Sequence, residues 1–95
     1  MEMRNFVDVW EDGKFDDVAA CVSYYPDFEE WESIGRLRMY EVSDLLEKQV
    51  KTNYPELTGA QFDPESEGFM VYCDSVDVAE VINEELNYLI EYLVG

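Results

Sequence analysis

Carboxylates are the side chains of this sequence that are most able to do chemistry. The 95 residues include 23 Asp and Glu but only six Lys and Arg, which gives a net charge of −17. Close carboxylate pairs can act as acid and base in glycoside hydrolysis, or hold a metal ion for hydrolysis. With so many acids, however, close pairs are expected by chance. A two-layer domain of this length also seldom encloses a large active-site pocket, so we expect no enzyme.

Other residues that support catalysis or metal binding are missing or badly spaced. The chain has no histidine, which excludes a His-based catalytic triad, a His metal ligand and the usual pH switch. Cys21 and Cys73 are too far apart for a Cys-x-x-Cys motif, so we expect two buried free thiols. A calcium loop starting at Asp8 fails because Trp10 stands at its third position. We therefore expect no metal site and no cofactor.

The composition indicates a folded domain in spite of the charge. Hydrophobic residues make up 47% of the chain and aromatic residues 15%, which is too rich for a disordered acidic tail. The length suits one domain, residues 1–95. No apolar run approaches the roughly 20 residues that span a bilayer, and the start of the chain has no apolar stretch typical of a secretory signal. We expect a cytoplasmic protein.

The charge also bears on partners. A strongly negative surface disfavours nucleic acid and anionic membranes, and it favours fast encounter with a basic protein. The alternative is that the acids serve only solubility, or reflect a salt-rich cytoplasm.

The hydrophobic pattern divides the chain into two similar halves, each with two strands followed by a helix. Residues 5–10 and 18–25 alternate like two strands of a hairpin, and a helix is predicted over 28–53, with Asp27 as its cap. A second hairpin is predicted from 59–62 and 69–73, joined by a turn over 63–68. A last helix then begins at Ser75 or Asp77. The prediction is a two-layer α+β fold of order ββαββα, with a four-stranded, mainly antiparallel sheet and both helices on one face.

Such a fold leaves the other face of the sheet open. If Val7 and Val9 face the helices, then Phe6, Asp8 and Trp10 face outward, and Tyr72 with Tyr25 or Tyr24 can join them. Aromatic and acidic side chains together would make this face an interaction surface. Two alternatives stay open, namely the opposite register and a second copy of the chain that covers the face as a homodimer.

Acids lie next to aromatic residues in two further places. One group surrounds the turn of the first hairpin, and the densest mixture runs from Tyr24 to Glu32. The acids at the start of the first helix also suit the positive end of its dipole, and Trp31 can simply be core. Aromatic anchors with a polar rim are nevertheless typical of interfaces. The predicted contact residues are Asp8, Trp10, Glu11, Asp12, Asp16, Asp17, Tyr24, Tyr25, Asp27, Glu29, Glu30 and Tyr72.

The second half resembles a known family. The carrying segments are Leu45-Leu46-Glu47 at a helix end, Phe62-Asp63-Pro64-Glu65-Ser66-Glu67-Gly68-Phe69-Met70-Val71-Tyr72, and Asp74-Ser75 before an amphipathic helix. Over roughly residues 42–94 the chain is similar to the bacterial immunity protein 51 family. That resemblance implies an antidote which binds and occludes a secreted toxin, without catalysis.

Two other functions compete with that expectation. An acid-studded small domain can imitate the charge spacing of DNA, as a phage-type inhibitor of a restriction, CRISPR or repair enzyme would. Mimicry predicts acids in a row on an outer surface, such as Asp77, Glu80, Glu84 and Glu91 on the last helix. A subunit or adaptor of a basic assembly is the third possibility.

Overall fold

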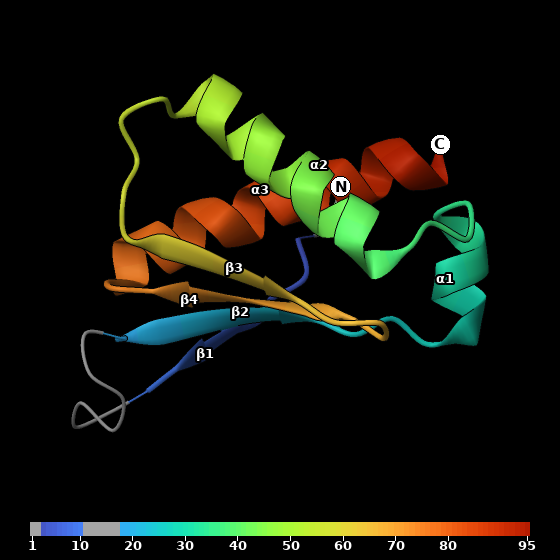
Figure 1. Cartoon of the computed structure of the whole chain (residues 1–95), viewed down its shortest axis with the longest axis horizontal. Helices are drawn as coiled ribbons and strands as arrows, with labels where there is room; N and C mark the ends of the chain where they lie inside the picture. Colours follow the sequence, from blue (N-terminus) through green and yellow to red (C-terminus); the bar gives the residue numbers. More distant parts are fainter. Residues whose placement is uncertain (1–2, 11–17) are drawn as a thin grey trace.

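The chain folds into an antiparallel sheet and three helices over the residues that the computed structural model describes, 3–10 and 18–95 (Figure 1). In chain order the elements are β1 (Val7–Val9), β2 (Ala20–Tyr24), α1 (Phe28–Ser33), α2 (Met39–Asn53), β3 (Ala60–Pro64), β4 (Phe69–Cys73) and α3 (Val76–Val94). The strand order is β1-β2-β4-β3, so the two hairpins lie side by side and join through β2 and β4. The predicted α+β class and ββαββα order are confirmed.

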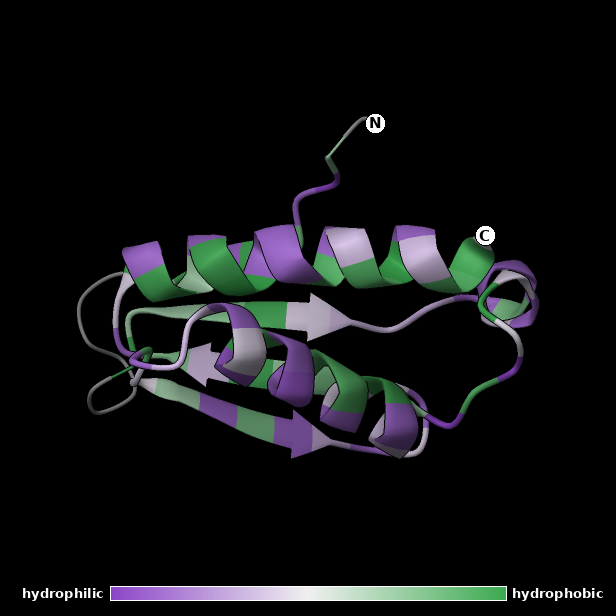
Figure 2. Ribbon diagram, turned by 90° about the horizontal axis from the view of Figure 1, so that it is seen from above, coloured by the Kyte–Doolittle hydropathy of each residue, from purple (hydrophilic) through white to green (hydrophobic). Residues whose placement is uncertain are grey.

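Alternating burial defines the two faces of the sheet. In β4, Phe69, Val71 and Cys73 are buried, whereas Met70 and Tyr72 between them are only partly covered. Figure 2 shows the same alternation in β3 as hydrophobic and hydrophilic bands along the strand. Successive side chains of a strand point to opposite faces, so this pattern fixes which residues face the helices.

The helices α2 and α3 lie on one face of the sheet (Figure 1). The longer helix α3 packs over β1, β2 and β4, and α2 packs over β3 and β4. Apolar side chains of both helices, among them Leu46 and Leu86, meet Val22 and Val71 of the sheet in one core. Of the two candidate caps of α3, Ser75 is the one that caps it, because its hydroxyl accepts a hydrogen bond from the backbone N–H of Val78 at 3.2 Å.

The prediction of one continuous helix over 28–53 is wrong, because the helix is interrupted between α1 and α2. Gly35 has a φ of 93° and Arg36 a φ of 56°, both in the left-handed region. The N–H of Gly35 donates to the carbonyl of Glu32 at 3.1 Å, and that of Arg36 to the carbonyl of Trp31 at 2.9 Å. These two bonds form a Schellman motif, the usual way in which a glycine ends a helix. Gly35 therefore terminates α1 and does not serve a close approach to the sheet.

One residue of α2 departs from the helical pattern of residues 28–53. That pattern predicts Leu45 on the buried side together with Met39, Leu46 and Val50, but Leu45 is 39% exposed, whereas the other three are in the core.

The segment before β1 is held by two asparagines of α3. The side-chain oxygen of Asn87 accepts from the backbone N–H of Arg4 at 2.9 Å, and its amide nitrogen donates to the carbonyl of Arg4 at 2.8 Å. The backbone N–H of Phe6 donates to the side-chain oxygen of Asn83 at 2.8 Å. These side chains hold residues 4 and 6 against α3, and β1 itself spans only Val7–Val9 of the predicted 5–10. The helical pattern of the last helix predicts Asn87 on its solvent side, but these bonds hold it against residue 4 and it is buried.

Candidate partner-binding surface

The face of the sheet turned away from α2 and α3 is named here the open face. Its central row pairs Asp8 with Cys21, Cys21 with Tyr72 and Tyr72 with Gln61 across the four strands. Among the described residues, no helix packs on this face (Figure 1). The register in which Val7 and Val9 face the helices is the one observed, since their partners Val22 and Ala20 are buried on the helix side.

Aromatic side chains and carboxylates alternate on the open face. The rings of Trp10 and Tyr72 have centroids 6.0 Å apart, and the indole N–H of Trp10 donates to Asp8 at 3.2 Å. The hydroxyl of Tyr72 donates to Asp63 at 3.4 Å. At the end of the face beyond β2, the hydroxyl of Tyr25 donates in the same way to Glu65, also at 3.4 Å. Three aromatic residues therefore each hold one carboxylate in place.

The phenols keep their protons in this surrounding. Partial burial, reinforced by Asp63, raises the pKa of Tyr72, and partial burial with Glu65 raises the pKa of Tyr25. Both hydroxyls are therefore hydrogen-bond donors at physiological pH. The carboxylates Asp8, Asp63 and Glu65 make no ion pair with any described residue. Their charge thus remains available to an approaching cation.

Gly68 makes room for one of these aromatic rings. A Cβ added at Gly68 would lie 2.3 Å from Cδ1 of Tyr25 and 2.4 Å from the carbonyl oxygen of Tyr24. Any larger residue at this position would displace the Tyr25 ring or the end of β2.

Two residues that were expected on the open face lie on the other side of the sheet. Tyr24 is 1% exposed and packs in the core against Phe6 and Phe69, at ring distances of 5.7 Å. The alternation of β2 places Tyr24 on the helix side and Tyr25 on the open side, so only Tyr25 can touch a partner. Phe6 lies just before β1, and its backbone N–H bonds to Asn83 of α3 and not to a neighbouring strand. Its side chain therefore points toward the core.

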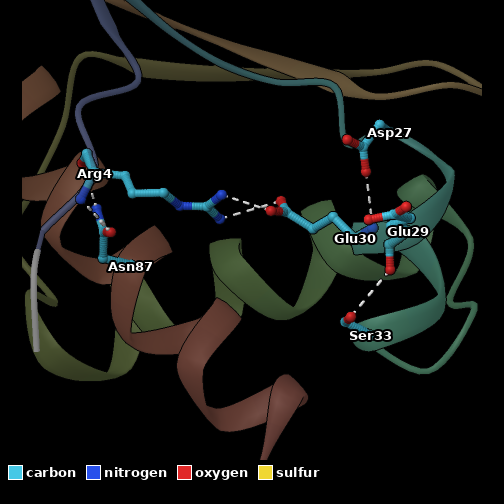
Figure 3. A network of polar contacts seen from close by, with 6 residues as sticks. All are labelled: Arg4, Asp27, Glu29, Glu30, Ser33 and Asn87. Carbon is cyan, nitrogen blue, oxygen red and sulfur yellow. Dashed lines mark hydrogen bonds and ion pairs between the residues drawn. The ribbon is translucent and has the colours of Figure 1, made fainter.

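Two of the three acids at the start of α1 are bonded to groups of the chain itself (Figure 3). Asp27 is the N-cap and accepts a hydrogen bond from the backbone N–H of Glu30 at 2.9 Å. Both oxygens of the Glu30 carboxylate accept from the guanidinium of Arg4, at 2.5 and 3.1 Å. These hydrogen bonds lower the pKa of Glu30 in spite of its partial burial. Asp27 and Glu29 are both exposed, but of the three acids only Glu29 makes no side-chain bond with a described residue.

Four predicted contact residues fall in the turn of the first hairpin. Glu11, Asp12, Asp16 and Asp17 lie outside the described residues.

Sequence reasoning missed three members of the open face, Met70, Asp63 and Glu65. Alternation within 69–73 puts Met70 on the same side as Tyr72, which was a usable signal. The other two were assigned to a turn, whereas β3 continues to Pro64 and places Asp63 opposite Met70.

Other kinds of site find little support in the part of the chain that the structure describes. No group of three or more Cys, Asp or Glu residues there is arranged to hold a metal ion. None of the helices described combines the length and the apolar character needed to cross a membrane. Cys21 and Cys73 are both buried free thiols, as expected. Comparison with protein-family models, curated proteins and solved structures gave no match.

Proposed function

We propose that this protein is an acidic binding module that occludes the active surface of a basic protein, without catalysis. The observation that carries the proposal is the open face, where three carboxylates that form no ion pair with a described residue lie beside three aromatic rings. No family model matches the chain, so the choice of a toxin as the partner is supported only by the resemblance of roughly residues 42–94 to the immunity protein 51 family noted in the sequence. A nuclease toxin fits best, because an enzyme that binds nucleic acid has a basic surface.

Charge and aromatic surface contribute differently to such a complex. A net charge of −17 accelerates the encounter with a basic partner, up to about 10⁸–10⁹ M⁻¹s⁻¹ at low salt. Salt screens that attraction, with a Debye length of about 8 Å at physiological ionic strength. Tyr and Trp are the residues that most often anchor interfaces, so Trp10, Tyr25 and Tyr72 would slow dissociation.

A DNA mimic is the second candidate, and the outer surface of α3 favours it. Asp77, Glu80, Glu84 and Glu91 are all exposed on this one helix. The steps from Asp77 to Glu80 and from Glu80 to Glu84 rise by roughly 4.5–6 Å along the helix, a spacing of the same order as that of phosphates along one DNA strand. The step from Glu84 to Glu91 is seven residues, or roughly 10.5 Å. In this case the partner would contact α3 and not the open face.

The test begins with capture of the partner from lysate of the producing cell at low salt, followed by mass spectrometry. Two triple variants are then compared by surface plasmon resonance. One neutralises the open face (Asp8→Asn, Asp63→Asn, Glu65→Gln), and the other neutralises α3 (Glu80→Gln, Glu84→Gln, Glu91→Gln). Both remove three negative charges, so a non-specific charge effect is the same in the two proteins.

We expect a basic partner whose affinity falls as salt rises, and a loss of about tenfold or more, roughly 1.4 kcal/mol, for the open-face variant only. The opposite ranking would support DNA mimicry by α3. An affinity that is indifferent to salt would refute the electrostatic mechanism. Inhibition of nuclease activity by the wild-type protein would identify the partner class.

A further inference from the structure

Besides the open face, the structure has a concave surface between α1, the segment that joins α1 to α2, and the turn between β3 and β4. We call it the aromatic groove, because the rings of Tyr25, Phe28, Trp31 and Tyr40 line it. Its volume is about 760 Å³, which is in the range of sites that hold a large side chain or a small ligand.

The break between α1 and α2 creates this groove. The Schellman motif at Gly35 turns the chain, so that residues 34–38 wrap around the end of α1 instead of continuing it. The indole N–H of Trp31 donates to the carbonyl of Leu37 at 2.9 Å, which fixes the ring against the connecting segment. The guanidinium of Arg36 lies 5.8 Å from the centre of the same ring. The wall formed by Trp31 is therefore held by two contacts.

Other rings of the groove are unusually bare. Phe28 is 64% exposed and Tyr40 is 55% exposed. The ring centroid of Phe28 is 5.9 Å from that of Trp31, so the two form a continuous aromatic surface that is open on one side. Exposed aromatic surface of this kind, next to polar residues, is typical of a contact site.

Charges at the groove indicate which kind of side chain it would accept. Two carboxylates, Asp27 and Glu67, line it against one cation, Arg38. The surrounding chain adds the field of a protein with a net charge of −17. That charge also opposes a second copy of the chain as the occupant, because the two copies would repel each other.

We propose that the aromatic groove receives an aromatic side chain of the basic partner that is flanked by a lysine or arginine. The ring would pack on Phe28 and Tyr40, and the flanking cation would lie near Asp27 and Glu67. Tyr25 belongs both to the groove and to the open face, so one partner can contact both surfaces at once. This inference rests on the proposed function in that the partner is the same basic protein.

Small probes test the groove without the partner. Tryptamine carries an indole and an ammonium group, indole-3-propionate carries the same ring with a carboxylate, and n-butylamine carries the ammonium without a ring. Each is titrated into the ¹⁵N-labelled full chain at physiological salt, and the indole N–H signal of Trp31 and the amides of residues 25–40 are followed. We expect saturable shifts with tryptamine, and shifts at least several-fold smaller with the other two.

Variants then locate the binding. Phe28→Ala and Tyr40→Ala are each expected to weaken tryptamine binding roughly three- to tenfold, the effect of losing one aromatic contact. Tyr92→Ala is the matched control, because Tyr92 is 80% exposed on α3 and does not line the groove. Arg38→Gln is expected to strengthen tryptamine binding, since it removes the one cation of the groove.

Three results would overturn the inference. Equal shifts with indole-3-propionate would show that the groove does not select a cation, and equal shifts with n-butylamine would show that the rings are not involved. Unchanged signals of Trp31 with every probe would show that the groove binds none of them. None of these results touches the salt dependence of partner binding, so the groove can fail while the proposed function stands.

Discussion

On the covered face of the sheet, Tyr24 and Phe69 lie in the core beneath the helices, whereas on the open face Trp10 and Tyr72 turn away from every described helix. Phe69 and Tyr72 belong to the same strand, β4, and are three residues apart, so they point to opposite faces. Both faces contain large aromatic rings in mutual contact, with centroids 5.7 Å apart on one face and 6.0 Å apart on the other.

The two faces differ in what buries their aromatic rings. On the covered face an aromatic side chain is fully removed from water by folding, so its burial stabilises the fold. On the open face the same kind of side chain stays partly in water and carries a hydrogen bond to a carboxylate, such as that of Tyr72 to Asp63. Its remaining surface can be buried only by a partner. One face should therefore govern stability, and the other binding.

The largest difference is expected between Phe69→Ala and Tyr72→Ala. Phe69 is 0% exposed, so truncation removes buried area and leaves a cavity, which costs about 3–5 kcal/mol of unfolding free energy. Tyr72→Ala is expected to cost about 1 kcal/mol or less, because its ring is only partly covered. Urea unfolding followed by circular dichroism measures both values.

A small domain is marginally stable, so Phe69→Ala can leave too little folded protein to measure. Phe69→Leu then replaces it and should still cost more than Tyr72→Ala. Equal costs at the two positions would contradict the assignment of the faces.

Hydrophobic patterns along the whole chain were enough to predict the order of the elements and the helix-covered face of the sheet. Hydrophobic periodicity reports which residues share a side, and it did so correctly for the apolar side of α3 and for Val7 and Val9, but it misplaced Asn87. It could not distinguish Tyr24 from Tyr25, because neighbouring tyrosines exchange faces with a shift of one residue. Only the pairing of β2 with β4 decides that Tyr24 is core.

Local backbone geometry explains the other errors. Gly35 lay within the apolar arc of a helical pattern, so it was assigned to the interior of a helix, although a glycine is also the usual helix terminator. The side-chain bonds from Asn83 and Asn87 to residues 4 and 6 join segments some 80 positions apart, and periodicity carries no trace of such contacts. The candidate groove depends on the break at Gly35, so sequence pattern alone did not predict it.

Cysteine reactivity sharpens the comparison further, because each face holds one thiol. Cys21 lies on the open face opposite Tyr72, and Cys73 lies on the covered face; both are 0% exposed. Burial raises the pKa of Cys21, and that of Cys73 to about 12, so both thiols should react slowly with iodoacetamide at neutral pH. In Tyr72→Ala we expect several-fold faster alkylation of Cys21 and unchanged protection of Cys73, measured by mass spectrometry of the peptides. Equal acceleration of both thiols would indicate unfolding, and faster alkylation of Cys73 would reverse the assignment of the faces.

The smallest expected effect concerns the ion pair that closes one end of the covered side, between Arg4 and Glu30. The hydrogen bonds from Arg4 lower the pKa of Glu30 from its ordinary value of 4.5. A carboxylate with a lowered folded-state pKa adds stability above its unfolded pKa, and that stability is lost as the pH falls through the folded value. Because both side chains are partly exposed, Glu30→Gln should cost about 1 kcal/mol or less at pH 7.

Removing any carboxylate from so acidic a protein also relieves repulsion, so Glu29→Gln serves as the control. Glu29 is exposed one position earlier in α1 and makes no ion pair with a described residue. The difference in unfolding free energy between the two variants then isolates the contact with Arg4. It should be present at pH 7 and shrink as the pH is lowered below about 4.5. A difference that does not shrink as the pH falls through the acid range would mean that Glu30 supports the covered side by packing and not by its charge.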